Sequence, residues 1–209
     1  SIDFFFRITK VMMEEVVAFD QSRHRDEIQR NVEVKQAMKR EHVVKRIVDV
    51  FVQVMRQHCT SSGSMDNNNT LPDGGSGNGT TGIASSNGQG VRLLSLCLRT
   101  MSEWIGWMDL NLVVQNIFLT PLFQCLGSPS LRIRIETVVC LRELVDKNMS
   151  SVARVSLLSK VGLVNVLIQY GIPRLRDRQN KMNEFDAEME DAEELAEELA
   201  NLVNSLAYR

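Results

Sequence analysis

The sequence has few aromatic residues and few prolines, and this scarcity limits the fold classes that suit it. Only 6% of the 209 residues are aromatic and only 4 are Pro, whereas Met occurs 10 times and 44% of the residues are hydrophobic. Helices tolerate this composition better than sandwiches or barrels do, and the apolar content is enough for a sizeable core. The composition therefore predicts an all-α protein.

The sequence also lacks a long apolar run and an excess of charge of one sign. No run approaches the roughly 20 residues that a membrane span needs, and we see no signal peptide, so we expect no membrane partner. The formal net charge is -2. Basic residues gather in 23–56 and 174–181 and acidic ones in 184–198, so the position of the charge, rather than its sum, bears on partners.

Cysteine is scarce, and its spacing does not suggest a metal site. The 4 cysteines, Cys59, Cys97, Cys125 and Cys140, form no CxxC pair and have no His at ligand spacing. Three of them lie in apolar helical runs, where a free cysteine is most often a small buried side chain. We therefore expect free thiols and a reducing compartment.

Catalytic signatures are missing as well. His24, His42 and His58 lie in polar surroundings with no arrangement that pairs a nucleophile with a base. The glycine-rich stretch 59–90 has neither the phosphate-loop pattern nor any Lys, and the acidic stretch has no EF-hand loop pattern. We expect no enzymatic activity, no metal and no cofactor.

Apolar residues at intervals of three and four predict helices over most of the chain. The first predicted helix, 2–19, has an apolar stripe that comprises Ile2, Phe5, Ile8, Met12, Val16 and Phe19. Two more helices are predicted over 30–40 and 41–57. We expect helical repeats in 1–58, a disordered Ser, Gly and Asn-rich loop insertion in 59–90, and helical repeats that continue the same solenoid in 91–209.

Residues 91–126 predict a helical hairpin with a tight elbow. Asp109 can cap the second helix, Trp104 and Trp107 are large enough to pack the elbow, and Trp107, Asp109 and Asn111 are the residues that we expect to set its angle. The next helix, 130–147, is apolar nearly all round, which predicts that other helices cover it on two sides. Repeated hairpins spaced by about 40 residues favour an α-solenoid of HEAT-type antiparallel helical hairpins, with a compact helical bundle as the alternative.

Two sets of charged residues are candidate binding surfaces. The basic set has the charge that RNA phosphates need, although interleaved acidic residues also suit ordinary surface ion pairs. Its members are Arg30, Lys35, Lys39, Arg40, Lys45, Arg46, Arg174, Arg176, Arg178 and Lys181. The acidic set, a candidate face for a protein partner, comprises Glu190, Asp191, Glu194, Glu197 and Glu198.

Three stretches carry a family resemblance. They are Arg30-Asn31 followed by Lys35, Met38 and Lys39-Arg40, then the WMDLNLVV run 107–114, and then Arg134 with the CLRELVDKNM run 140–149. In order and approximate spacing they resemble the exportin-T (tRNA exportin) branch of the importin-β, or karyopherin, family. Residues 60–90 and 174–183 depart from that pattern.

The resemblance implies an internal HEAT-repeat portion of a nuclear export receptor. Such a receptor binds tRNA together with Ran-GTP in the nucleus, contacts nuclear pore proteins through its full length, and releases its cargo in the cytoplasm when GTP is hydrolysed. It shuttles between nucleus and cytoplasm and is not an enzyme. Two alternatives stay open, namely a HEAT-type protein-binding scaffold and another karyopherin transport receptor without RNA cargo.

Overall fold

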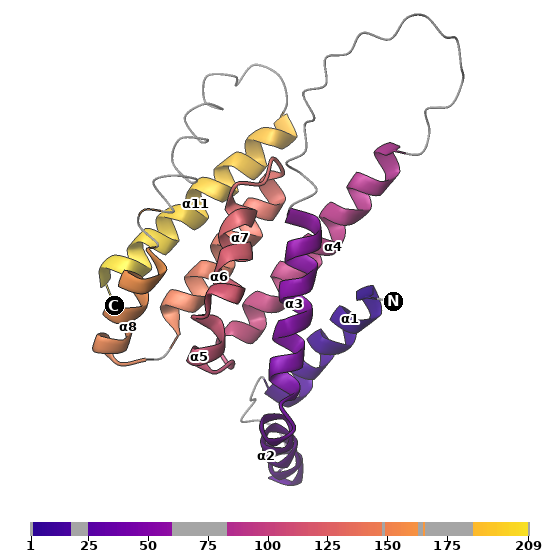
Figure 1. The fold of residues 1–209 in the computed structure, drawn as a ribbon, viewed down its shortest axis with the longest axis vertical. Coiled ribbons are helices and arrows are strands. Elements are labelled where there is room, and N and C mark those ends of the chain that lie inside the picture. The colour runs from indigo at the N-terminus through magenta and orange to yellow at the C-terminus, as the bar shows by residue number, and fades with distance from the viewer. Residues whose placement is uncertain are drawn as a thin grey trace, which may run out of the picture.

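Apolar residues at helical spacing form helices throughout the computed structural model, which describes residues 2–17, 25–59, 83–147, 149–162, 165 and 186–208 (Figure 1). In chain order the elements are α1 (Ile2–Met12), the π-helix η1 (Met13–Val17), α2 (Arg25–Arg40), α3 (Val43–Cys59), α4 (Ile83–Ile105), α5 (Leu110–Val113), α6 (Asn116–Leu126), α7 (Leu131–Asp146), α8 (Ser151–Val161) and α11 (Asp186–Tyr208). In these ranges no helix is long and apolar enough to cross a membrane.

The helices pack in two layers. In one layer α4 lies between α1 and α7, and α7 lies between α4 and α11 (Figure 1). In the other layer α3 packs on α6, while α3 also packs on α4, α6 on α7, and α2 on α3. The pairs α3/α4 and α6/α7 are therefore consecutive antiparallel hairpins, and their stacking is that of an α-solenoid, as the sequence predicted.

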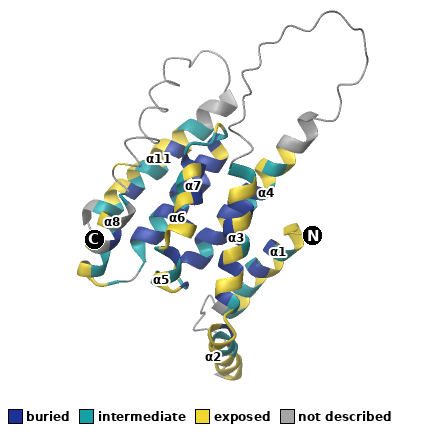
Figure 2. Ribbon diagram, viewed as in Figure 1, coloured by how far each residue is buried: buried dark blue, intermediate teal, exposed yellow. Residues whose placement is uncertain are grey.

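Helix α7 is the most enclosed element. Its buried residues lie on all sides of the axis and include Leu131, Ile133, Val138 and Leu144. Much of α7 is accordingly coloured as buried in Figure 2. A helix that is buried nearly all round must be covered on two sides, and α4 and α11 supply the two covers. The predicted position of this helix between neighbours is confirmed.

Several boundaries differ from the sequence prediction. The first helix changes from α to π geometry at Met13, and α2 begins at Arg25 instead of residue 30. Helix α4 begins at Ile83, so residues 83–90, which we assigned to the loop insertion, are helical. The second arm of the hairpin predicted over 91–126 is split into α5 and α6, and its two arms are not each other's main partners, because α4 and α6 each pack chiefly on α3 and α7. The expected disorder of the remaining loop lies outside the described residues.

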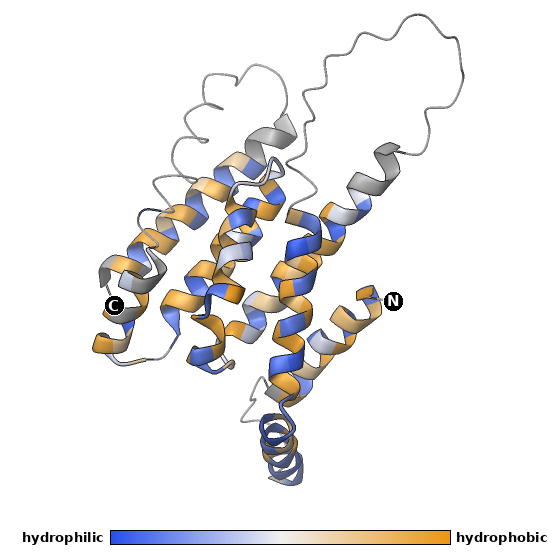
Figure 3. Cartoon of the chain, viewed as in Figure 1, coloured by the Kyte–Doolittle hydropathy of each residue, from blue (hydrophilic) through white to orange (hydrophobic). Residues whose placement is uncertain are grey.

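The buried face of α1 matches the predicted apolar stripe only in part, since Phe5 and Met12 of the stripe pack against the core. Phe6 and Thr9 are buried, whereas Ile2 and Ile8 are each 43% exposed. The reason is that the Phe6 ring stacks on Phe51 of α3 and the Thr9 carbonyl accepts a hydrogen bond from Trp104 of α4, so this side of the helix meets its neighbours. Figure 3 shows that α1 is hydrophobic along most of its length. A single sequence does not show which of two apolar faces meets the neighbour.

The cysteines divide into two kinds. Cys97 and Cys140 are free and buried, as expected. Cys59 at the end of α3 and Cys125 in α6 form a disulfide, so the expectation of free thiols was wrong for this pair. The two residues are 66 positions apart in the sequence, and it is the packing of α3 on α6 that brings their Cα atoms to 5.8 Å.

Candidate nucleic-acid interface

Four of the predicted basic residues meet at the corner between α2 and α3. Lys39 and Arg40 end α2, and Lys45 and Arg46 lie in the first turn of α3. The chain turns between them at His42, which has a positive φ of 54°. All four basic side chains are exposed, and we call this set the α2–α3 corner.

The other basic candidates are spread more widely. Arg30 is exposed further back on α2, and Lys35 is half-buried on the same helix. The second basic cluster, at Arg174, Arg176, Arg178 and Lys181, lies outside the described residues. The structure therefore brings four of the ten candidates together and places two more on α2.

The elbow between α4 and α5 is built from local hydrogen bonds and two indoles. Asp109 is the N-cap of α5, and its side chain accepts a hydrogen bond from the backbone N–H of Asn111 at 2.8 Å. Trp104 is fully buried, and its indole N–H donates to the carbonyl oxygen of Thr9 in α1 at 3.2 Å. Trp107 is half-buried and meets Trp104 edge to face, with 5.6 Å between ring centroids.

The elbow lies beside the α2–α3 corner. The ammonium of Lys39 stands 5.6 Å from the centroid of the Trp107 ring, a cation–π distance. From the end of α7, Lys147 donates to the carbonyl oxygens of Ile105 and Gly106 at 3.0 and 2.8 Å, which satisfies the last carbonyls of α4. Burial lowers the pKa of Lys147, and the charge of Asp109 opposes that shift.

This edge of the molecule thus combines exposed cations with a half-buried aromatic ring. The ends of α2, α4 and α7 converge there, which the sequence alone did not show. Lys147 belongs to the 140–149 stretch of the family resemblance. It was not among the predicted basic residues, because the cations near it in space come from other helices and not from its neighbours in the sequence. Two further exposed cations, Arg92 and Arg99, lie on α4.

Most of the acidic candidates interact with arginines of the same chain. Glu194 and Glu198 of α11 form ion pairs with Arg132 and Arg142 of α7. The charge of Asp191 also acts on Arg132. These contacts hold α11 against α7, which reduces the charge available to a protein partner.

Two acidic candidates remain. Glu197 is exposed on α11, and of Glu190 only the backbone is described. The acidic face that the sequence predicted therefore contains two carboxylates in ion pairs with α7 and, in Glu197, a further exposed carboxylate.

Arg132 also holds a buried carboxylate. Two of its guanidinium nitrogens, Nε and one Nη, donate to the same Oε1 of Glu136, at 3.1 and 2.8 Å. Burial raises the pKa of Glu136, and the charge of Arg132 opposes that rise. Glu136 is only 5% exposed, so this acid serves the packing of α7 and not a binding surface.

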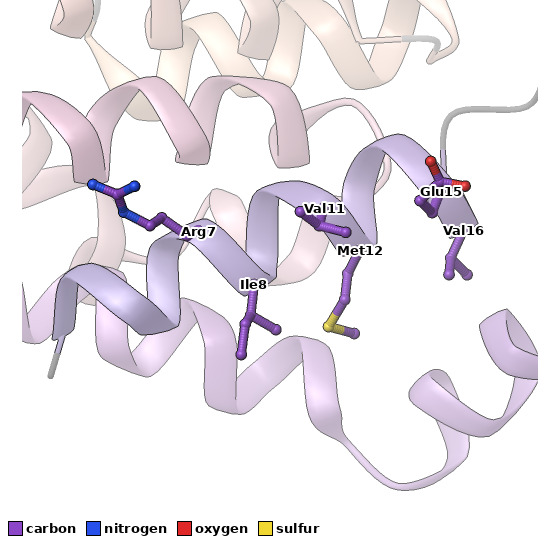
Figure 4. A pocket seen from close by; sticks show the side chains of 6 residues that line it. All are labelled: Arg7, Ile8, Val11, Met12, Glu15 and Val16. Carbon is purple, nitrogen blue, oxygen red and sulfur yellow. The ribbon is translucent and has the colours of Figure 1, made fainter.

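A groove of about 350 Å³ runs along α1 and η1 (Figure 4). Its lining is mostly apolar and has one charged residue near each end. The lining residues are Arg7, Ile8, Val11, Met12, Glu15 and Val16. In the described part of the chain no three or more His, Cys, Asp or Glu side chains gather where they could hold a metal ion.

Comparison with known proteins supports one family. Exportin-T of Dictyostelium discoideum is 27% identical over 167 residues, which is 80% of this chain and 12% of that protein. Exportin-T of Mycosarcoma maydis is 28% identical over 130 residues, 62% of this chain and 12% of the relative. Exportin-T of Coprinopsis cinerea is 29% identical over 118 residues, 56% of this chain and 11% of the relative.

The chain therefore spans about an eighth of the length of these curated relatives. The family model described as exportin 1-like protein matches residues 1–141, which include every helix from α1 to α6 and most of α7. With its two-layered solenoid and this match over more than half of its length, the chain belongs to the exportin 1-like protein family.

Proposed function

We propose that this chain is part of a nuclear export receptor of the karyopherin type that binds tRNA together with Ran-GTP and carries it from the nucleus to the cytoplasm. The observation that carries the proposal is the similarity to Exportin-T over 80% of the chain. The stacked hairpins support it, because solenoids offer long surfaces on which two macromolecules can bind at once. The protein has no catalytic role in this scheme.

The α2–α3 corner is the part of the described surface best suited to RNA. Lys39, Arg40, Lys45 and Arg46 are exposed within two adjoining helical turns, and Arg40 makes a 3.6 Å exposed ion pair with Glu41. Exposed pairs of this kind contribute little and release the cation readily. Arg30, Lys35 and the cluster 174–181 extend the proposed phosphate contacts.

The partner proteins require other surfaces. In the proposal, Ran-GTP is bound together with the RNA, and nuclear pore proteins are contacted through the full-length receptor during shuttling. Of the acidic candidates on α11, Glu197 is an exposed one that can face a protein partner, whereas Glu194 and Glu198 are paired with α7.

The test is tRNA binding by the full-length protein with and without Ran-GTP, over a range of salt concentrations. We expect binding to require Ran-GTP and to weaken steeply with salt, because phosphate contacts release counterions. The double substitutions Lys39→Glu with Arg40→Glu, and Lys45→Glu with Arg46→Glu, should each weaken binding. Each lost phosphate contact should reduce the slope of log affinity against log salt by about 1.

A matched control reverses two cations outside the corner. Arg92 and Arg99 are exposed on α4, so Arg92→Glu with Arg99→Glu changes the net charge by the same amount as either test variant. Reversal of the corner should weaken tRNA binding more than this control does. If corner and control variants bind tRNA equally well, the corner is not the RNA contact.

The competing function is a HEAT-type scaffold or a transport receptor without RNA cargo. The mixed charge on the helices supports this reading, since mixed faces are often only solvated. It predicts that no charge reversal changes RNA affinity and that binding of tRNA does not depend on Ran-GTP. Either result would show that RNA is not the cargo. The protein would then transport proteins or assemble with them.

A further inference from the structure

A disulfide joins two consecutive hairpins of the solenoid on one layer only. Cys59 is the last residue of α3 and Cys125 lies near the end of α6, and their Cα atoms are 5.8 Å apart. The hairpin partners α4 and α7 in the other layer contact each other through packed side chains with no such bond. The angle between the two hairpins is therefore restrained by a covalent bond on one side and by packing on the other.

The two linked cysteines differ in access to solvent. Cys59 is half-buried at the end of its helix, whereas Cys125 is fully buried. The two remaining cysteines are of another kind, because Cys97 and Cys140 are fully buried and burial raises the pKa of both thiols. A thiol reacts as its thiolate, so these two are inert in the folded protein.

We propose that Cys59 and Cys125 form a reversible redox modification site, oxidised by hydrogen peroxide and reduced by a dithiol protein, that locks and unlocks the angle between the α3/α4 and α6/α7 hairpins. Its reversibility rests on the proposed function, because a protein that shuttles between nucleus and cytoplasm meets a reducing thiol pool. A disulfide in that setting is a transient state.

The oxidation follows two balanced steps. The Cys59 thiolate attacks one oxygen of hydrogen peroxide, the O–O bond breaks, and a Cys59 sulfenic acid and hydroxide form. The hydroxide takes up the proton that the Cys59 thiol released and becomes the first water. The Cys125 sulfur then attacks the Cys59 sulfur, the S–O bond breaks, the S–S bond forms, and the departing hydroxyl leaves as a second water with the Cys125 proton. Two electrons pass from the two thiols to the peroxide.

Reduction returns both thiols. A thiolate of a thioredoxin-class dithiol attacks the disulfide, its second thiol resolves the mixed disulfide, and the reductant leaves as its own disulfide. The reduced site is compatible with the surrounding packing, since the Cys59 sulfur lies 3.9 Å from the carbonyl oxygen of Pro121, within reach of a thiol donor. The covalent change between the two states is thus one bond between α3 and α6.

The test uses the full-length protein without RNA or Ran, so that its result does not depend on transport activity. The protein is reduced, exposed briefly to hydrogen peroxide, alkylated and digested, and the cysteine peptides are identified by mass spectrometry. We expect a linked Cys59–Cys125 peptide pair that disappears after treatment with thioredoxin and its reductase. Amide hydrogen exchange at the ends of α3 and α6 should be slower in the oxidised protein.

The controls use cysteines in the same helical array. Cys59→Ser is conservative at a half-buried helix end and should abolish the linked pair without changing helicity, and Cys125→Ser should abolish it too. Cys97→Ser should leave the linked pair intact.

The proposal is overturned if peroxide produces no linked pair, if the pair survives the thioredoxin system, or if exchange in α3 and α6 is the same in both states. Failure of tRNA binding would leave these results unchanged, so the two proposals fail separately.

Discussion

Replacing Trp104 by Phe should destabilise the protein far more than the same replacement at Trp107. Trp104 is fully buried, and its indole N–H is bonded to the carbonyl of Thr9, which ties α4 to α1. Loss of that bond in a buried setting costs about 1 kcal/mol. The smaller ring leaves a void of roughly 40 Å³, which at about 24 cal/mol per Å³ adds about 1 kcal/mol. The expected loss is therefore about 2 kcal/mol.

Trp107 is the matched control because it belongs to the same elbow and is only half-buried. Its replacement by Phe keeps an aromatic ring under Lys39 and weakens one partly exposed cation–π contact, which is worth about 0.5 to 1 kcal/mol at most. Since these are the only 2 tryptophans in the sequence, each variant also leaves a single reporter of fluorescence.

The assay is urea unfolding followed by far-UV circular dichroism, with amide hydrogen exchange as a local measurement. The Trp104 variant should show faster exchange in α1, because its link to α4 is lost, while the Trp107 variant should not. Equal loss of stability in the two variants, or a loss below about 0.5 kcal/mol for Trp104→Phe, would refute the assignment of the Trp104 indole as the tie between α1 and α4.

Arg142→Ala and Glu198→Ala should each weaken the packing of α11 on α7. A double-mutant cycle measured by urea unfolding should give a coupling energy of about 1 kcal/mol, because the two side chains are only 25% and 19% exposed. A coupling energy of zero would contradict this prediction. Burial raises the pKa of Glu136 above its usual 4.5 despite Arg132, so the folded state holds this proton more tightly, and the corresponding stability is lost as pH rises from 4.5 through the raised pKa. The stability of Glu136→Gln relative to the unsubstituted protein should therefore increase between pH 4 and pH 7, and a difference that is constant with pH would argue against it. Lys147→Met removes the donor to the last carbonyls of α4 and should lower the free energy of unfolding by about 1 to 2 kcal/mol, measured in urea; an unchanged value would show that water replaces the ammonium.

Features that depend on neighbouring residues could be predicted from the sequence. The helices follow from apolar spacing, and the Asp109 cap follows from one polar residue placed before an apolar turn. The enclosed position of α7 also follows, because apolar residues on all sides of a helix leave few alternatives. Each of these inferences needs only the local pattern and elementary geometry.

Features that depend on packing between distant segments could not be predicted. The Cys59–Cys125 bond requires knowing that α3 lies on α6. The ion pairs from Arg132 and Arg142 to α11 join residues 62 and 56 positions apart, so they require the register of α7 against a distant helix. Without that register the acidic residues resembled a free surface.

The role of Asn31, in the first of the three stretches that resemble the exportin family, also depends on packing between distant segments. Its Asn31 is 6% exposed, and its side-chain amide donates to the carbonyl oxygen of Glu15 in η1 at 2.9 Å. A polar residue among charged neighbours is easily taken for part of a binding surface. Asn31 instead satisfies a backbone carbonyl at the point where the first helix has π geometry. Its role became visible only with α2 placed against η1.

The row of helices from α1 through α4 and α7 to α11 has a consequence for how the protein loses its structure. Each helix of the row depends on the helices beside it, so local unfolding can propagate from one neighbour to the next as in a one-dimensional chain. In such an array the interfaces on the two sides of α7 determine whether the ends melt separately or together. Strengthening or weakening one of them changes the cooperativity of unfolding and not only its midpoint.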